Sequence, residues 1–320
     1  MNTFGQNFRI SIFGESHGNS LGILIDGCPA GIPISEADFK SDLLRRKSGA
    51  KGTTNRIEAD KPEIQSGVFN HKTTGTPILI SFKNENTKSK DYSQFIKHPR
   101  PSHTDFVFHK KYNGFQDYRG GGHSSGRMTL ALVAAGVLAK KIISEINISA
   151  NLIEVDGQKD IERAINKAID NKDSVGGIVE CRAQNMPIGL GEPFFNSIES
   201  QISQLIFSIP GTKAIEFGSG FAAATMKGSE FNDVIIDKKG TTESNHSGGI
   251  NGGVSNGNDL IFRVAIRPAA SISLPQNSYH FEHQKMEDLE IKGRHDTCIA
   301  LRTPVIIEAV TAIALADFKL

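Results

Sequence analysis

Apolar residues along the chain recur at two periods, which predict both strands and helices. Short runs rich in β-branched residues and bounded by Gly, Pro or Asn are typical of strands. Such runs occupy residues 8–13, 21–26, 77–82, 151–155, 178–182 and 260–266. Because they alternate with helical segments, the pattern predicts an α/β or α+β protein. The order of the strands within a sheet stays open.

Helical spacing of isoleucine and leucine predicts helices around residues 161–169 and 198–209. Residues 128–143, MTLALVAAGVLAKKII, are apolar on most sides, so we expect that helix to be deeply buried.

Two further helices are indicated by their first residues. Ser35 and Asp38 have the spacing of a capping box ahead of an apolar face. Thr303 and Pro304 predict an N-cap and first helical position for a last helix that runs towards Asp317.

The chain shows no sign of secretion or of a membrane span. Its first residues lack a basic head followed by an apolar stretch, and no apolar run approaches the roughly 20 residues that cross a bilayer. Cys28, Cys181 and Cys298 are odd in number and widely spaced, as expected of unpaired, buried thiols in a reducing compartment. We therefore expect a soluble, cytoplasmic protein without a membrane partner.

The net charge of +1 argues against a nucleic-acid partner, which would call for a basic excess. Glycine is unusually common, at 32 of 320 residues. It concentrates with Ser, His and Arg in five segments, which hold five of the ten histidines. They are residues 14–18 (GESHG), 100–105 (RPSHTD), 119–127 (RGGGHSSGR), 245–257 (NHSGGINGGVSNG) and 293–296 (GRHD).

These segments have the composition of anion sites. Glycine lets a backbone approach a ligand, while Ser hydroxyls and Arg guanidinium groups bind phosphate or carboxylate oxygens. RGGGHSSGR leads directly into the apolar helix, as in phosphate sites at helix N-termini, although a Gly-rich turn with a capping serine has the same pattern. Residues 245–257 fit either a ligand loop or a mobile surface loop. The basic run Arg45–Lys51 fits either a solvated face or a cover over an anionic substrate.

Several common motifs are missing. The chain has neither a P-loop nor HExxH, and GSGFAA at 218–223 has no clear helix after it, as a dinucleotide fold requires. His280 and His283 have no convincing third ligand nearby in the sequence, so we expect no metal site.

The ordered set of motifs resembles the chorismate synthase family. It runs along nearly the whole chain, from GESHG through SGVF, KTTGTPI, RPSHTD, RGGGHSSGR, PIGLGEPFF, KAIEFGSGF and NHSGGINGGVSNG to GRHD. The resemblance implies one large α+β domain over residues 1–320, a β-α-β sandwich, assembled as a homotetramer. It also implies a lyase of the shikimate pathway that serves aromatic amino-acid biosynthesis. The enzyme would convert 5-enolpyruvylshikimate 3-phosphate to chorismate by anti-1,4-elimination of phosphate, with reduced FMN as a cofactor that undergoes no net redox change.

By position, the resemblance implies three catalytic residues. His17 matches a histidine near the departing phosphate, His103 one that protonates or stabilises the reduced flavin, and Asp296 an aspartate that relays the proton away. Histidine suits such work because modest shifts move its pKa across neutrality. Residues expected to bind substrate are Ser16, Arg46, Arg100 and Arg127. Those expected to bind the flavin are His123, Ser124, Ser125, Gly252, Arg267, Pro268, Ala269, Ala270, Ser271 and Arg294, with Pro210 and Gly211 contributed by a neighbouring subunit.

Some positions depart from the family pattern. His123 stands where many members have Arg, so a permanent charge becomes pH-dependent. Ser102 and Thr104 replace the common Gly and Ala, and Thr297 replaces Pro. The basic segment after Arg45 lacks one arginine and is one residue short, which predicts a different hold on the substrate.

Two alternatives share the anion clusters. A flavin-independent phosphate lyase or phosphatase would turn over substrate without reduced flavin, and a non-catalytic FMN or anion carrier would need none of the three catalytic residues. Nothing in the chain resembles a reductase domain, so we expect an external supply of reduced FMN, with NADPH at most an indirect reductant.

Overall fold

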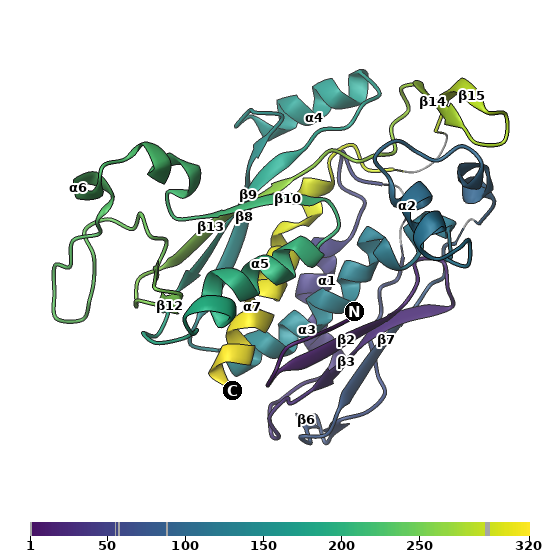
Figure 1. Ribbon diagram of the computed structural model, residues 1–320. Helices are drawn as coiled ribbons and strands as arrows, with labels where there is room; N and C mark the ends of the chain where they lie inside the picture. The colour runs from purple at the N-terminus through teal and green to yellow at the C-terminus, as the bar shows by residue number, and fades with distance from the viewer. Residues whose placement is uncertain (1, 55, 57, 88, 292–294) are drawn as a thin grey trace.

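The computed structural model has two β-sheets with a layer of helices between them (Figure 1). It describes residues 2–54, 56, 58–87, 89–291 and 295–320, with the backbone alone at 89–91. Helices α3 (Thr129–Ile142) and α7 (Pro304–Lys319) pack against each other in the middle layer. The arrangement is a β-α-β sandwich of the α+β class, which confirms the expected fold.

The first sheet covers the α3 side of the helical layer and is antiparallel throughout. Its strands, in spatial order, are β1 (Thr3–Phe4), β2 (Arg9–Gly14), β3 (Ser20–Asp26), β7 (Ile78–Lys83) and β4 (Glu63–Ile64). Leu21, Ile23 and Ile25 of β3 are fully buried, since alternate residues of a strand share a face.

The second sheet covers the α7 side and is also antiparallel. Its order is β10 (Thr212–Phe217), β13 (Leu260–Ile266), β9 (Gly177–Gln184) and β8 (Asn147–Val155). Helix α5 (Ile198–Ser208) packs on both α7 and β10. All six predicted strands are present, with ends moved by a few residues at most positions.

The predicted helices are also present. The capping box forms at Asp38, whose carboxylate accepts the backbone N–H of Ser35, and a 3₁₀ turn (Glu36–Phe39) leads into α1 (Lys40–Arg46). The two helices predicted from the spacing of isoleucine and leucine are α4 (Ile161–Asp170) and α5. Thr303 and Pro304 are the N-cap and first position of α7, as predicted, although the Thr303 hydroxyl donates to the Ala300 carbonyl of the preceding 3₁₀ turn and makes no capping bond to α7.

Shorter elements surround this frame. They are α2 (Thr104–Lys111), α6 (Gly228–Phe231), the hairpins β5–β6 (Val68–Phe69, Lys72–Thr73), β11–β12 (Ile250–Asn251, Val254–Ser255) and β14–β15 (Gln276–His280, Lys285–Leu289), and several 3₁₀ segments, η2 (Ser89–Ile96), η3 (Arg119–Ser124), η4 (Gly126–Met128), η5 (Phe194–Asn196), η6 (Gly220–Thr225) and η7 (Ile299–Arg302). The segment 218–223 is thus followed by no α-helix of the length a dinucleotide fold needs.

One hydrophobic cluster runs through both sheets and the helices between them. It includes Ile23 of the first sheet, Leu138 of α3, Val310 of α7 and Phe262 of the second sheet. This continuity supports the expectation of a single domain. Across the described ranges, no helix has the length and apolarity needed to cross a membrane.

Candidate active site

A cavity of about 990 Å³ lies where β1 and β2, α2, α3, α5 and the segment before α7 meet. Seven cationic side chains against three carboxylates line it among the described residues. The cations are Arg46, Lys47, Arg56, Arg127, Lys213, Arg267 and Arg302, and the acids Glu58, Asp60 and Asp296. The excess of positive charge in one concave site suits a small ligand with several negative charges.

The glycine loop before α3 forms one wall of the cavity. Gly120, Gly121 and Gly122 all have positive φ, which L side chains rarely adopt. The loop ends at Ser125, whose hydroxyl accepts the Arg127 backbone N–H and caps η4. The sequence thus folds here into a tight turn directly before a buried helix.

His17 packs against this loop. A Cβ on Gly120 would lie 2.4 Å from Cε1 of His17, so only glycine leaves room for the ring. Burial, with Arg56 and Arg119 nearby, lowers the pKa of His17 to about 4. The ring is therefore neutral at pH 7, and its buried Nδ1 has no hydrogen-bond partner among the described residues. Ser16, next to it, is held by Arg56, which donates to both its hydroxyl and its carbonyl at 3.0 Å.

Asp60 organises two of the predicted arginine clamps. Its carboxylate accepts from Arg46 at 3.0 Å and from Arg127 at 2.8 Å, one arginine on each oxygen. All three side chains are almost fully buried, and both arginines line the cavity. Burial alone would raise the pKa of Asp60, but the two arginines more than offset it, so the pKa lies below its usual value. Together, Asp60, Arg46 and Arg127 carry a net charge of +1.

His103 is oriented by Asp105. Its Nδ1 lies 2.7 Å from Oδ1 of Asp105, 3.1 Å from Nη2 of Arg100 and 3.3 Å from the Asp105 backbone nitrogen. All of these contacts are made by Nδ1, which leaves Nε2 as the ring nitrogen without a partner among the described residues. Arg100 donates to the Asp105 carboxylate from Nε at 2.8 Å and from Nη2 at 2.9 Å, and its Nη1 donates to the Ser271 hydroxyl. Its guanidinium is thus occupied behind His103 and does not line the cavity, so Arg100 is placed as a support of His103, not as a substrate clamp.

Asp296 lies on the cavity wall just before α7. One oxygen accepts the Thr54 backbone N–H at 2.9 Å, and the other accepts from Arg302 at 2.8 Å. The bond to Thr54 ties Asp296 to the short basic segment that follows α1. The carboxylate therefore connects two walls of the cavity.

Comparisons with known proteins agree on one family. A family model described as chorismate synthase matches residues 8–320. The chorismate synthase of Chitinophaga pinensis is 59% identical over 321 residues, which cover 100% of this chain and 97% of that protein. The chain belongs to the chorismate synthase family. The chorismate synthase of Cytophaga hutchinsonii is 43% identical over 354 residues, covering 100% of this chain and 97% of its own length.

A crystal structure of chorismate synthase has the same fold. It superimposes with a TM-score of 0.75 at 27% identity and covers 98% of this chain and 92% of its own. Because the matches span nearly the full length of both partners, the chain is an enzyme with chorismate synthase function.

Most residues predicted for the family's flavin site line the same cavity. They are His123, Ser124, Ser125, Pro210, Gly211, Arg267, Ala269, Ala270 and Ser271. Pro210 and Gly211 do so in the same chain, so they need no neighbouring subunit to reach the site. His123 bonds the Gly14 carbonyl through Nδ1 at 2.6 Å and contacts the Asn2 side chain through Nε2.

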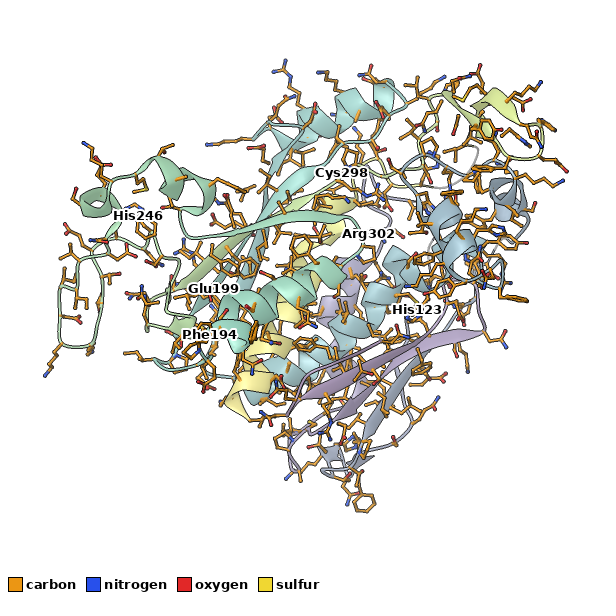
Figure 2. The ribbon with its side chains drawn as sticks, viewed as in Figure 1. His123, Phe194, Glu199, His246, Cys298 and Arg302 are labelled. Atoms are coloured by element: carbon orange, nitrogen blue, oxygen red, sulfur yellow. The ribbon has the colours of Figure 1, made fainter. Side chains whose placement is uncertain are left out.

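Other predicted members of the chorismate synthase site lie elsewhere. Gly252 belongs to the β11–β12 turn and does not line the cavity, nor does Pro268. His246, from the same glycine-rich segment as Gly252, lies far from His123 and Arg302 in Figure 2 and hydrogen-bonds Ser219. Arg294 lies outside the described residues.

The sequence interpretation missed several members of the site, notably Arg56, Asp60, Asp105 and Arg302. Asp105 ends the motif RPSHTD, two residues after His103, and that spacing was a signal for an orienting carboxylate. Asp60 carried no such signal, because its partners are 14 and 67 residues away.

Proposed function

We propose that the enzyme converts 5-enolpyruvylshikimate 3-phosphate to chorismate by anti-1,4-elimination of phosphate, as a carbon–oxygen lyase of the shikimate pathway that requires reduced FMN. The observation that carries this proposal is the cationic cavity in which His103, Asp296 and the paired arginines meet. The substrate has a phosphate and two carboxylates, and FMN adds a phosphate.

Charge balance explains why so many cations are needed. Two like charges 4 Å apart repel by about 4 kcal/mol at an effective dielectric constant near 20. Several anionic groups could share one cleft only if fixed cations surround them. Seven cationic side chains on the wall meet that need, and Asp60 holds two of them in place before any ligand arrives.

The residues present fit FMN beside the substrate. The cavity lies at the upper end of the roughly 300–1,000 Å³ range of small-molecule sites, which leaves room for a substrate next to a flavin. Two buried polar atoms of cavity-lining residues, Nε of Arg46 and Nε of Arg302, have no partner among the described residues, as expected where a ligand completes the hydrogen bonding. His123, Ser124, Ser125, Arg267 and the 269–271 segment would hold the flavin.

When bound, reduced FMN supplies a transient electron that helps phosphate leave and takes up the ring proton. The protein's part is to orient groups and to hold protons. His103 presents a free Nε2 because its Nδ1 is occupied by Asp105 and Arg100, so the ring can accept or return a proton at Nε2. Asp296 lies on the same cavity wall, 2.8 Å from Arg302, and offers a carboxylate that can take the proton onward.

Arg46 and Arg127 receive the phosphate in the cavity, while His17 does not line it and packs against the glycine loop that does. A neutral His17 next to Arg56 would become protonated as a phosphate dianion approaches, since a nearby negative charge favours the imidazolium. Arg46 and Arg127 are too well fixed by Asp60 to follow the leaving group, so they bind it in one orientation.

An anaerobic assay tests the proposal. Enzyme, 5-enolpyruvylshikimate 3-phosphate and photoreduced FMN should give chorismate absorbance, and the same mixture with oxidised FMN should give none. Chorismate formed without reduced flavin would favour a flavin-independent lyase. Absence of chorismate together with tight FMN binding would favour a non-catalytic carrier.

Replacement of His103 by Ala tests its assigned role. We expect turnover to fall by roughly 10²-fold or more, the range of general acid–base catalysis, while FMN binding largely survives. His109→Ala, at the other end of the same helix and away from the cavity, is the matched control. Near-wild-type turnover of His103→Ala would contradict the role.

We further propose a homotetramer in the cytoplasm with an external source of reduced FMN. Exposed aromatic side chains support association: Phe194 and Phe195 are 86% and 88% exposed, and Phe194 projects beside α5 in Figure 2. Three buried free thiols suit a reducing compartment. Light scattering tests the tetramer and cell fractionation the location, and activity with NADPH and FMN alone in air would reveal an intrinsic reductase.

A further inference from the structure

The β14–β15 hairpin gathers three side chains that commonly bind metal ions. His280, His283 and Glu287 each place one nitrogen or oxygen within 4.8 Å of the others. The sequence showed the two histidines without a third ligand. Antiparallel pairing of Ser278 with Glu287 across the hairpin brings the carboxylate back beside them. Imidazole nitrogens with one carboxylate form a donor set typical of Zn²⁺.

The three groups already contact one another. Nδ1 of His283 lies 3.0 Å from Oε2 of Glu287, and the His283 backbone N–H donates to Nδ1 of His280 at 3.2 Å. The two imidazole rings stack with centroids 3.9 Å apart and planes 8° apart. A proton therefore joins His283 to Glu287, where a cation could bridge the same nitrogen and oxygen.

We propose that this hairpin binds one Zn²⁺ ion through His280, His283 and Glu287, with water completing the tetrahedron. Ligand atoms around tetrahedral Zn²⁺ lie about 3.3 Å apart, given Zn–N distances near 2.0–2.1 Å. Separations of up to 4.8 Å within the cluster thus need to shorten by about 1.5 Å. Its side chains are partly exposed, which leaves them free to make that movement.

Lys285 is the main competitor for the site. Its ammonium lies 2.9 Å from Oε1 of Glu287, but the side chain is 66% exposed and can swing into water. The more buried His98 lies behind the cluster, with its ring 4.9 Å from that of His280, and bonds the Ser278 carbonyl.

The hairpin is attached to the segment that carries His103. The Phe281 N–H donates to the Lys97 carbonyl at 2.9 Å, Phe281 stacks on Phe106 of α2 at 5.2 Å, and Lys97 pairs with Glu282. Zn²⁺ at the turn would restrain Phe281, which lies between His280 and His283 in the sequence. The site is therefore a structural one that stiffens the support of α2.

Zinc binding to the purified full-length enzyme tests the proposal. Zn²⁺ is titrated against a chromophoric chelator with wild type, His283→Ala, Glu287→Gln and the control Glu282→Gln. Glu282→Gln removes one negative charge from the same hairpin, as Glu287→Gln does. Glu282 pairs with Lys97 and is not one of the proposed ligands. Circular dichroism checks that each variant is folded, and hydrogen exchange of the Phe281 amide is measured with and without Zn²⁺.

We expect wild type and Glu282→Gln to bind one Zn²⁺ that both His283→Ala and Glu287→Gln bind at least tenfold more weakly. Zn²⁺ should also slow exchange at Phe281 in wild type but not in Glu287→Gln. Equal zinc affinity in all four proteins would place the ion at other histidines, such as those of the cavity, and would overturn the proposal. So would the absence of zinc binding by wild type.

Discussion

A single carboxylate, Asp60, positions two arginines of the active site. Asp60 has a positive φ of 52°, a conformation that Asn adopts almost as readily as Asp. The substitution Asp60→Asn therefore removes the charge with little backbone strain. It leaves Arg46 and Arg127 buried close together without their shared counterion.

We expect Asp60→Asn to destabilise folding by roughly 3–5 kcal/mol, the usual cost of breaking a buried ion pair. In the protein that still folds, KM for substrate should rise more than kcat falls, because the arginines bind the substrate and do not transfer protons. Urea denaturation and steady-state kinetics measure the two effects. Glu63→Gln, which breaks an exposed pair with Lys83, is the control. Unchanged KM in Asp60→Asn would show that the arginines do not need this anchor.

His17 makes stability depend on pH in a defined window. Its pKa is about 4 in the folded protein and near 6.5 when unfolded, so the unfolded chain binds the extra proton as pH falls. Its stabilising contribution is complete above pH 6.5 and is lost down to about pH 4, by roughly 3 kcal/mol at most.

The substitution His17→Asn should remove part of that acid sensitivity. Urea midpoints at pH 7 and pH 4.5 should differ less for His17→Asn than for wild type. His103, whose burial also lowers its pKa, would still contribute to the acid sensitivity of the His17→Asn protein. Identical pH profiles for the two proteins would mean that His17 is protonated in the folded state.

Among the elements, the η3 glycine loop depends most on tertiary contacts. Gly120 has φ of +58°, and a Cβ there would meet His17 at 2.4 Å. A Cβ on Gly126, six residues later, would have no heavy atom within 4 Å, and Gly126 has no positive φ. The two glycines thus form a matched pair within one segment.

Gly120→Ala should lower both stability and turnover, the latter by about tenfold or more, because it displaces a proposed phosphate-binding imidazole. Gly126→Ala should stay close to wild type in stability; because Gly126 itself lines the cavity, it is the control for stability only. Thermal melts compare the two variants, and the anaerobic assay compares Gly120→Ala with wild type. Equal stability of the two variants would show that His17 can move without cost.

At the scale of the whole molecule, the two sheets are held apart by the α3–α7 contact. Gly136 of α3 faces Ala309 of α7, and a Cβ on it would lie 2.4 Å from Cβ of Ala309. Neither helix can easily move away, since each is buried against a sheet.

Gly136→Ala should therefore destabilise the protein by about 1–3 kcal/mol, the usual cost of overpacking, despite the roughly 1 kcal/mol gain in helix propensity. Gly228→Ala in α6, where the added Cβ meets nothing within 4 Å, is the control. Urea denaturation of both tests this, and a Gly136→Ala protein as stable as wild type would mean that the helices can separate freely.

Much of the fold was predictable because it follows from local periodicity. The strand over residues 260–266 alternates buried and half-buried side chains along its whole length, and the apolar helix α3 is buried as expected. The short hairpins and 3₁₀ turns were not predicted, since they depend on single turn residues and on what they pack against. The Thr303 hydroxyl shows the same limit: Thr303 is the N-cap of α7, as predicted, but only the structure shows that its hydroxyl donates to the preceding turn.

The sequence by itself determined the secondary structure, the anion-binding composition and the family, because periodicity and ordered motifs are properties of neighbouring residues. Only the tertiary structure decided which residues meet. It turned Arg100 away from the cavity onto Asp105, joined Arg46 to Arg127 through Asp60, brought Pro210 and Gly211 into the site of their own chain, and paired Glu287 with the two hairpin histidines. These contacts join residues that are distant in sequence or separated by a turn, and they are selected by packing and burial of the whole chain, which no local pattern records.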